Sequence, residues 1–332
     1  MAERFTFRDG DRLIRFGEGA LGEAAGLLRE TGFEDYALLT TERGVAMADI
    51  GGDLVLHVPP GRVDEISAEL LPQTEGRPLV ALGGGRVIDT AKAIAGAGEG
   101  RCAAIPTTLS GAPMTPFHRL PAGARGARFT RPALVVAEPV LMTSQTGTQR
   151  AASAMNALAH AMESLYTPLA NPVAELAALR AAELFAETVP EEDPVPDRLA
   201  MAALLGGYAV GTTGLAVHHA ICQMVVRLCG APHAETNAVI LPHAARLMAT
   251  RAPGEMGALA QALGDHTGDP EAAAGLLARL AARSGHTRLS TLGVEEAQLD
   301  DVVEAVLSHR GLQATPEPPD RDELLDLLRA AL

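Results

Sequence analysis

The hydrophobic pattern of the chain changes near residue 146 of its 332 residues. Before that point, short apolar runs alternate with stretches that fit amphipathic helices; after it, Ala- and Leu-rich segments of helical length follow one another. Strands that alternate with helices imply crossover connections and a mostly parallel sheet, whereas consecutive helices pack on one another. The pattern therefore predicts an α/β domain over residues 1–146 and an all-helical domain over residues 147–332.

The predicted elements follow from apolar period and turn residues. Strands are expected over residues 13–16, 36–40, 53–58, 79–82, 102–105 and 133–136. Helices of the first domain are expected over residues 21–30, 63–71 and 86–97. Helices of the second domain are expected over residues 149–166, 173–188, 196–228, 235–250, 254–264, 270–284, 295–308 and 320–331.

The stretch 199–226 contains no charged residue and is long enough to span a bilayer. It also contains four glycines, His218, His219 and Gln223, which are costly in lipid. A helix buried on all sides within the helical domain is the better interpretation.

Charge and cysteine content limit the partners and the compartment. A formal charge of −14 argues against nucleic acid and anionic membranes as partners. The three cysteines form no CxxC pair, which fits a reduced cytoplasmic protein better than a disulfide framework. The first twelve residues contain no apolar h-region, so we expect no secretory signal.

A glycine-rich loop lies between the apolar run 79–82 and the helix expected to follow it: Gly83, Gly84 and Gly85. Glycines at such a point let backbone N–H groups approach a phosphate at the positive end of the helix. The loop is not GxGxxG, and a tight structural turn is the equally simple interpretation. Asp89 and Lys92 follow on the helix, where they fit a solvated surface pair. Thr107 and Thr108 follow the next strand, at the end where α/β sheets bind ligands.

Polar residues in the helical half suggest a second site. Asn156 and His160 are four residues apart in a helix expected to end before Pro168, so both side chains lie on one face. A later stretch offers His218, His219 and His233. This arrangement predicts a site built between helices, although a satisfied buried histidine is the alternative for each member.

Four segments, in this order, resemble the iron-containing alcohol dehydrogenase superfamily: LGGGRVIDTAKAIA, IPTTLSGAPMTP, NALAHAME and HHAICQ…PHAETNAVILPHA. NALAHAMESLYTPLANPV and PHAET are most similar to maleylacetate reductases. The resemblance implies a dinucleotide-binding α/β domain, a helical domain, and an active site in the cleft between them. It implies that the glycines hold the pyrophosphate of NADH or NADPH. The other implied cofactor-binding residues are Asp89, Thr107, Thr108 and Thr115.

Several positions depart from the superfamily pattern. Metal-dependent members hold a divalent ion with one Asp and three His, and the matching residues here are Asn156, His160, His219 and His233. An amide is a weaker ligand for a hard cation than a carboxylate, and maleylacetate reductases share this Asn and resemble a metal-free branch.

Gln223 replaces a histidine that resembles part of a proton relay. Thr41 stands where some relatives have an Asp that would reject a 2′-phosphate, so both NAD and NADP are allowed.

The resulting hypothesis is a reductase that passes hydride to an unsaturated or keto acid, with NADH or NADPH and without a metal. His160, His219 and His233 would donate hydrogen bonds and one would supply a proton, with Asn156 and Gln223 beside them. His118, Arg125 or Arg128 would pair a substrate carboxylate, unless they belong to a solvated loop. We expect a homodimer.

Three alternatives stay open. The same three histidines could bind Zn²⁺ or Fe²⁺ in a metal-dependent alcohol dehydrogenase. The altered site could serve a recruited non-redox lyase, cyclase or dehydratase. A binding protein without catalysis would need no nicotinamide cofactor.

Overall fold

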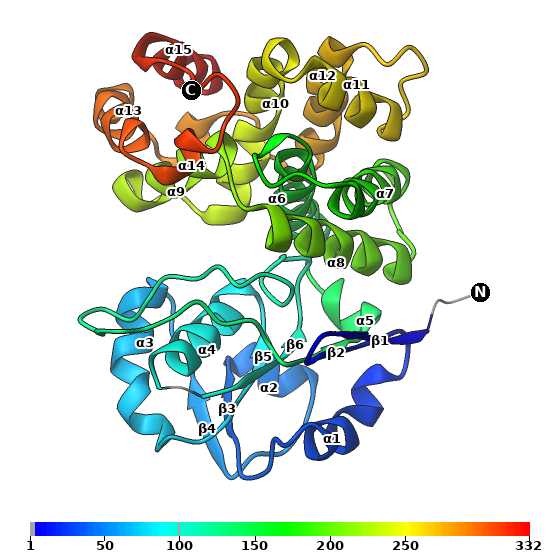
Figure 1. Ribbon diagram of the computed structural model, residues 1–332, viewed down its shortest axis with the longest axis vertical. Coiled ribbons are helices and arrows are strands. Elements are labelled where there is room, and N and C mark those ends of the chain that lie inside the picture. The colour runs from blue at the N-terminus through cyan, green and yellow to red at the C-terminus, as the bar shows by residue number, and fades with distance from the viewer. Residues whose placement is uncertain (1–3, 99) are drawn as a thin grey trace. The chain divides into compact units, whose positions relative to one another are not determined.

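The computed structural model describes residues 4–98 and 100–332 (Figure 1). The chain divides into two compact units, one ending at Gln145 and the other spanning Thr146–Leu332. Each unit has its own core and is described by itself.

The first unit is built on a seven-stranded sheet with the order β1-β2-β7-β6-β5-β3-β4. All neighbouring strands are parallel except the antiparallel pair β1 and β2. The mostly parallel sheet predicted from the sequence is therefore confirmed. The strands are β1 (Phe5–Asp9), β2 (Arg12–Phe16), β3 (Ala37–Thr40), β4 (Leu54–His57), β5 (Leu79–Gly83), β6 (Cys102–Pro106) and β7 (Leu134–Ala137).

The edge strand β1 was not expected from the sequence. Its residues are mostly exposed, so FTFRD lacks the apolar run of a buried strand. It folds back on β2 through a turn at Gly10, whose φ of 58° lies in the left-handed region that glycine adopts easily.

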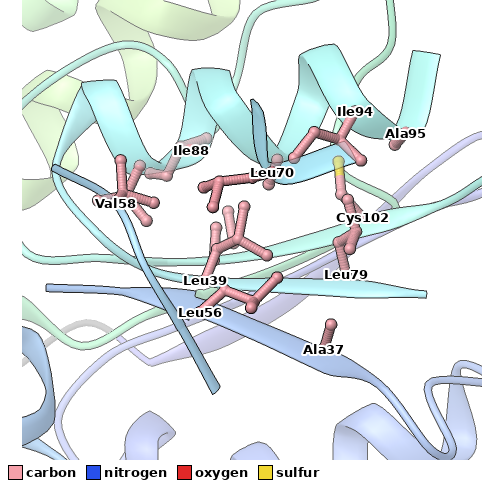
Figure 2. Packing of buried hydrophobic residues seen from close by; sticks show 14 of the residues in the cluster. Ala37, Leu39, Leu56, Val58, Leu70, Leu79, Ile88, Ile94, Ala95 and Cys102 are labelled. Atoms are coloured by element: carbon pink, nitrogen blue, oxygen red, sulfur yellow. The ribbon is translucent and has the colours of Figure 1, made fainter. Parts of the chain in front are cut away.

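Both faces of the sheet are buried at its centre, which explains why β5, β6 and β7 are continuously apolar. One cluster joins Leu39 and Leu79 of the sheet to Ile88 and Ile94, as Figure 2 shows. On the other face Val80 and Leu82 belong to a second cluster with Leu28. The helices of this unit are α1 (Ala20–Glu30), α2 (Glu42–Met47), α3 (Val63–Leu70), α4 (Gly85–Ala97) and α5 (Pro139–Met142).

The second unit is helical throughout its described length apart from turns. The helix α6 packs mainly against α7, α8 and α10, and it also contacts α9, α11 and α12, so it is covered on several sides. The helices are α6 (Gly147–Tyr166), α7 (Pro172–Thr188), α8 (Pro196–Thr213), α9 (Val217–Cys229), α10 (His233–Arg251), α11 (Pro253–Ala262), α12 (Pro270–Ala281), α13 (Leu299–Leu307), α14 (Arg310–Gln313) and α15 (Arg321–Ala331). As Pro168 predicts, α6 ends at Tyr166 and Thr167 is extended.

The expectation of one helix over residues 196–228 is wrong. The segment forms α8 and α9, which meet at an angle of 100°. Gly214 follows α8 with a φ of 87°, a conformation that stops a helix and favours glycine. Within the described residues no single helix is long and apolar enough to cross a membrane, and only this bent pair would satisfy length and composition together.

Candidate cofactor and catalytic sites

The glycine loop places an uncapped helix start at the carboxyl edge of the sheet. The strand β5 ends at Gly83, which pairs in register with Pro106 of β6. Gly84 caps the 13-residue helix α4 without a side-chain hydrogen bond. The first N–H groups of a helix have no partner within it, so these groups form a ready site for an anion.

Close packing rather than backbone conformation requires the three glycines. Gly83, Gly84 and Gly85 are absent from the positions with positive φ. A methyl group on Gly84 would lie 2.9 Å from Cγ2 of Thr108, and one on Gly85 would lie 2.7 Å from Oγ of Ser110. The loop thus lies directly against the segment that follows β6. Thr107 is buried and Thr108 is half-buried in that segment.

Lys92 is not the solvated surface residue that the sequence suggested. Its side chain is fully buried, and Nζ lies 2.7 Å from Oδ1 of Asp89. Nζ also donates to the carbonyl oxygens of Ala112 (3.0 Å), Thr115 (3.1 Å) and Phe117 (2.7 Å). The ammonium group therefore fixes the loop that carries the buried Thr115 to α4. Asp89, which was expected to contact the cofactor, is the ion-pair partner of Lys92.

The candidate substrate residues His118, Arg125 and Arg128 lie in the loop between β6 and β7. His118 donates from Nδ1 to the carbonyl oxygen of Arg119 (3.0 Å) and accepts at Nε2 from the backbone N–H of Thr130 (3.1 Å). Burial lowers the pKa of His118 and favours this neutral ring. Both ring nitrogens are thus occupied within the loop. The side chains of Arg125 and Arg128 are exposed.

In the helical unit, α6 brings three polar side chains to one face: Asn156, His160 and Glu163. All three are buried. The ring of His160 stacks on that of His219 from α9, with centroids 4.6 Å apart and an interplanar angle of 9°. Nε2 of His219 lies 3.4 Å from Oδ1 of Asn156. The structure therefore brings three of the predicted residues into direct contact.

His233 joins this cluster through two intermediate residues. Nε2 of His218 lies 2.9 Å from Oδ1 of Asn237, whose Nδ2 donates to the carbonyl oxygen of His233 (2.7 Å). The ring of His218 meets that of His219 edge-on at 4.9 Å. Gln223 follows one turn after His219 on α9 and is half-buried.

Glu163 is a residue of this site that the sequence analysis missed. Its side chain is completely buried; Oε2 accepts from Nδ1 of His219 (2.7 Å), and Oε1 accepts from the backbone N–H of His219 (3.1 Å). The sequence did contain one indication of its role: Glu163 lies three residues after His160 and seven after Asn156, on the same helical face. Its partner is 56 residues away in the sequence, so helix spacing alone could not identify it.

Burial controls the protonation of the cluster. It raises the pKa of Glu163, against the opposing effects of His218 and nearby backbone N–H groups. It lowers the pKa of His219, and His233 lowers it further. The pKa of His218 falls to about 3 for the same reason. His219 is thus a neutral ring whose Nδ1–H points at Glu163 and whose Nε2 is an acceptor. Oδ1 of Asn156 is also an acceptor, so a hydrogen bond between the two side chains requires the amide to present Nδ2 to the ring.

The donor set does not fit a divalent cation. Among the residues that the structure describes, no group of three or more His, Cys, Asp or Glu is arranged to hold a metal. The in-plane lone pairs of two nearly parallel rings, those of His160 and His219, cannot both point at one ion at the roughly 2.0–2.1 Å of a zinc–imidazole bond. Asn156 supplies a neutral oxygen where a hard cation favours a carboxylate.

Comparison with known proteins places the chain in a family. Residues 150–332 match the C-terminal domain model of the Fe-containing alcohol dehydrogenase family. The chain is 33% identical to maleylacetate reductase 2 of Cupriavidus pinatubonensis, over 96% of this chain and 94% of that protein. It is 31% identical to maleylacetate reductase 1 of Rhodococcus opacus, over 100% and 98%. The crystal structure of maleylacetate reductase from Agrobacterium tumefaciens is similar with a TM-score of 0.84 at 26% identity, covering 100% of this chain and 99% of that one.

The matches to the maleylacetate reductases run the length of both units. The chain belongs to the Fe-containing alcohol dehydrogenase family, and it is an enzyme of the oxidoreductase class.

Proposed function

We propose that the protein is an NAD(P)H-dependent reductase of the maleylacetate reductase type, acting on an unsaturated or keto acid. The observation that carries the proposal is the uncapped start of α4 against the end of β6, in a chain that aligns with maleylacetate reductases over nearly its whole length. Bound nicotinamide would supply the hydride.

The α/β unit would hold the cofactor. The N–H groups at the start of α4 would receive the pyrophosphate, since no side chain caps them. Thr107, Thr108 and Thr115 are the hydroxyl residues proposed to contact the rest of the dinucleotide. Lys92 would act on the cofactor only indirectly, by fixing the loop of Thr115.

The helical unit would supply the groups that orient the acid and move a proton. Because burial disfavours an imidazolium at His219, we propose that this ring accepts a hydrogen bond at Nε2 and orients its partners. His160 and His233 are then the proposed proton sources, together with water, since Gln223 does not titrate near neutral pH. From the α/β unit, the exposed Arg125 and Arg128 are the proposed partners of a substrate carboxylate.

We propose that this chemistry needs no metal. The neutral amide of Asn156 and the stacked rings of His160 and His219 support this part of the proposal. Elemental analysis of protein purified without chelator and without added metal should find no stoichiometric Zn or Fe. Stoichiometric metal, with activity lost on chelation and restored by the ion, would instead support a metal-dependent alcohol dehydrogenase.

The glycine loop offers the test of cofactor binding. Gly84→Val places a branched side chain against Thr108 and over the start of α4, so it should weaken NADPH and NADH binding at least about tenfold. Gly22→Ala is the matched control, because a methyl group there meets nothing within 4 Å. Fluorescence titration of both nucleotides measures the effect. Unchanged affinity in folded Gly84→Val would remove the cofactor site from the proposal.

A further inference from the structure

A pocket of about 400 Å³ lies within the α/β unit beside the glycine loop. Its walls come from the segments after β3 and β4 and from the first turn of α4. The strands β3 and β4 are parallel neighbours, and β5, which leads into α4, lies on the other side of β3. All three segments therefore leave the sheet at its carboxyl edge, where open α/β sheets bind ligands.

The charged side chains in the lining of this pocket are mainly basic. Arg43 and Arg86 are permanently charged, His57 adds a third basic group, and Glu42 is the only acid among the lining residues. The two arginines and one glutamate alone give a local charge of +1. The pocket is thus set up for an anion in a chain whose formal net charge is −14.

The two arginines are placed differently. Nη2 of Arg43 donates to the carbonyl oxygen (3.0 Å) and Oγ (3.2 Å) of Ser144, which anchors one side of its guanidinium group. Its remaining N–H groups can serve a ligand. Within the described part of the chain, the guanidinium of Arg86 forms no hydrogen bond or ion pair, and Arg86 directly follows Gly85. Both groups are therefore able to bind a phosphate bidentately.

The residue after β3 is neutral. Thr41 uses Oγ1 to accept from the backbone N–H of Gly44 (3.1 Å) and so caps α2. In dinucleotide sites, an acid near this point accepts from the ribose 2′-hydroxyl of NAD, whereas a nearby Arg accommodates the 2′-phosphate of NADP. Here the hydroxyl of Thr41 is occupied and Arg43 is two residues away.

We propose that this pocket binds the 2′-phosphate of NADPH, so that the protein prefers NADPH to NADH. This inference rests on the proposed function, because it assumes that a dinucleotide binds at the glycine loop. A phosphate monoester carries a charge of about −1.5 to −2 near pH 7. The negative charge of this phosphate would neutralise the positive charges of Arg43 and Arg86, whereas the 2′-hydroxyl of NADH carries no charge.

The test is the ratio of the dissociation constants of NADH and NADPH, measured by fluorescence titration. We expect NADPH to bind at least about tenfold more tightly, a difference of roughly 1.4 kcal/mol. The nicotinamide-free probes 2′,5′-ADP and 5′-AMP should show the same order by calorimetry. Arg43→Gln and Arg86→Gln should each lower the ratio at least about threefold, and Thr41→Asp should bring it to one or below, since its carboxylate repels the phosphate.

Arg8→Gln is the matched control. It removes the same charge from an exposed position on β1, at the opposite edge of the sheet from β4, and should leave the ratio unchanged. Glu42→Gln should raise the ratio. Equal affinities for NADPH and NADH, or arginine variants that weaken both equally, would overturn the inference and leave the proposed function standing. Failure of both nucleotides to bind would overturn the two together.

Discussion

Each of the two units buries one charged residue completely, and these two residues have different roles. Lys92 in the α/β unit is held by backbone carbonyl groups and Asp89, so its contacts build a loop. Glu163 in the helical unit is held by a histidine ring and a backbone N–H, so its contacts set the tautomer of a histidine that we propose takes part in catalysis. A buried charge therefore identifies function only when its partner can itself take part in chemistry.

The largest expected effect is the loss of stability when the contacts of Lys92 are removed. Lys92→Met removes the donor to three carbonyl groups and leaves Asp89 without its cation, so the free energy of unfolding should fall by about 3–5 kcal/mol. Urea unfolding measures this loss. A variant as stable as the wild type would show that the ammonium group does not hold the loop.

The burial of Lys92 can also be tested by chemical labelling, because Lys92 is the only lysine of the chain. An amine-reactive reagent should modify native protein at the N-terminal amine alone and label Lys92 only under unfolding conditions. Rapid labelling of Lys92 in the native protein would contradict its complete burial.

The next effect concerns Glu163. Glu163→Gln keeps the size of the side chain but can donate to Nδ1 of His219, which moves the ring proton to Nε2. We expect kcat/KM to fall about 10–100-fold, as for other residues that orient a functional histidine. Nitrogen-15 chemical shifts of the His219 ring should report the change of tautomer. Glu175→Gln, an exposed substitution on α7, is the control. An unchanged His219 tautomer and an unchanged kcat/KM would show that Glu163 contributes only to packing.

The pH dependence of stability is expected to be smaller. Burial keeps His218 neutral with a pKa of about 3, whereas an unfolded histidine titrates near pH 6.5. Below pH 6.5 the unfolded chain binds a proton that the folded chain does not, so stability decreases as the pH falls from 6.5 towards 3. Between pH 6.5 and 5 this single group should account for about 1.5–2 kcal/mol.

Urea unfolding at both pH values tests this dependence. His218→Gln should reduce the pH-dependent loss, whereas the exposed His266→Gln should leave it unchanged. Equal losses in the wild type and in His218→Gln would show that His218 is not held neutral by its surroundings.

The comparison also shows what the sequence could predict. Local patterns were sufficient for the strand, glycine loop and helix around Gly84, and for the end of α6 before Pro168. They failed at β1, whose exposed residues carry no apolar signal, and at Gly214, where one positive φ divides a continuous apolar run into two helices.

The partners of the buried charges depend on contacts between distant segments. Lys92 reaches residues 20 to 25 positions away, and Glu163 reaches a residue 56 positions away. Spacing along a helix places such a side chain on a face but does not reveal what that face meets. For this reason Lys92 was assigned to solvent and Glu163 was overlooked, whereas Asn156 and His160 were identified from their shared helix.

The most direct test of the central claim is the transfer of deuterium from NADPH labelled at nicotinamide C4 to maleylacetate, using protein stripped with a chelator. The account predicts cofactor oxidation at the rate of untreated protein and deuterium bound to carbon in the product, with one labelled stereoisomer of the cofactor as donor. Product without deuterium, or turnover that disappears on chelation and returns only with added Zn²⁺ or Fe²⁺, would contradict it.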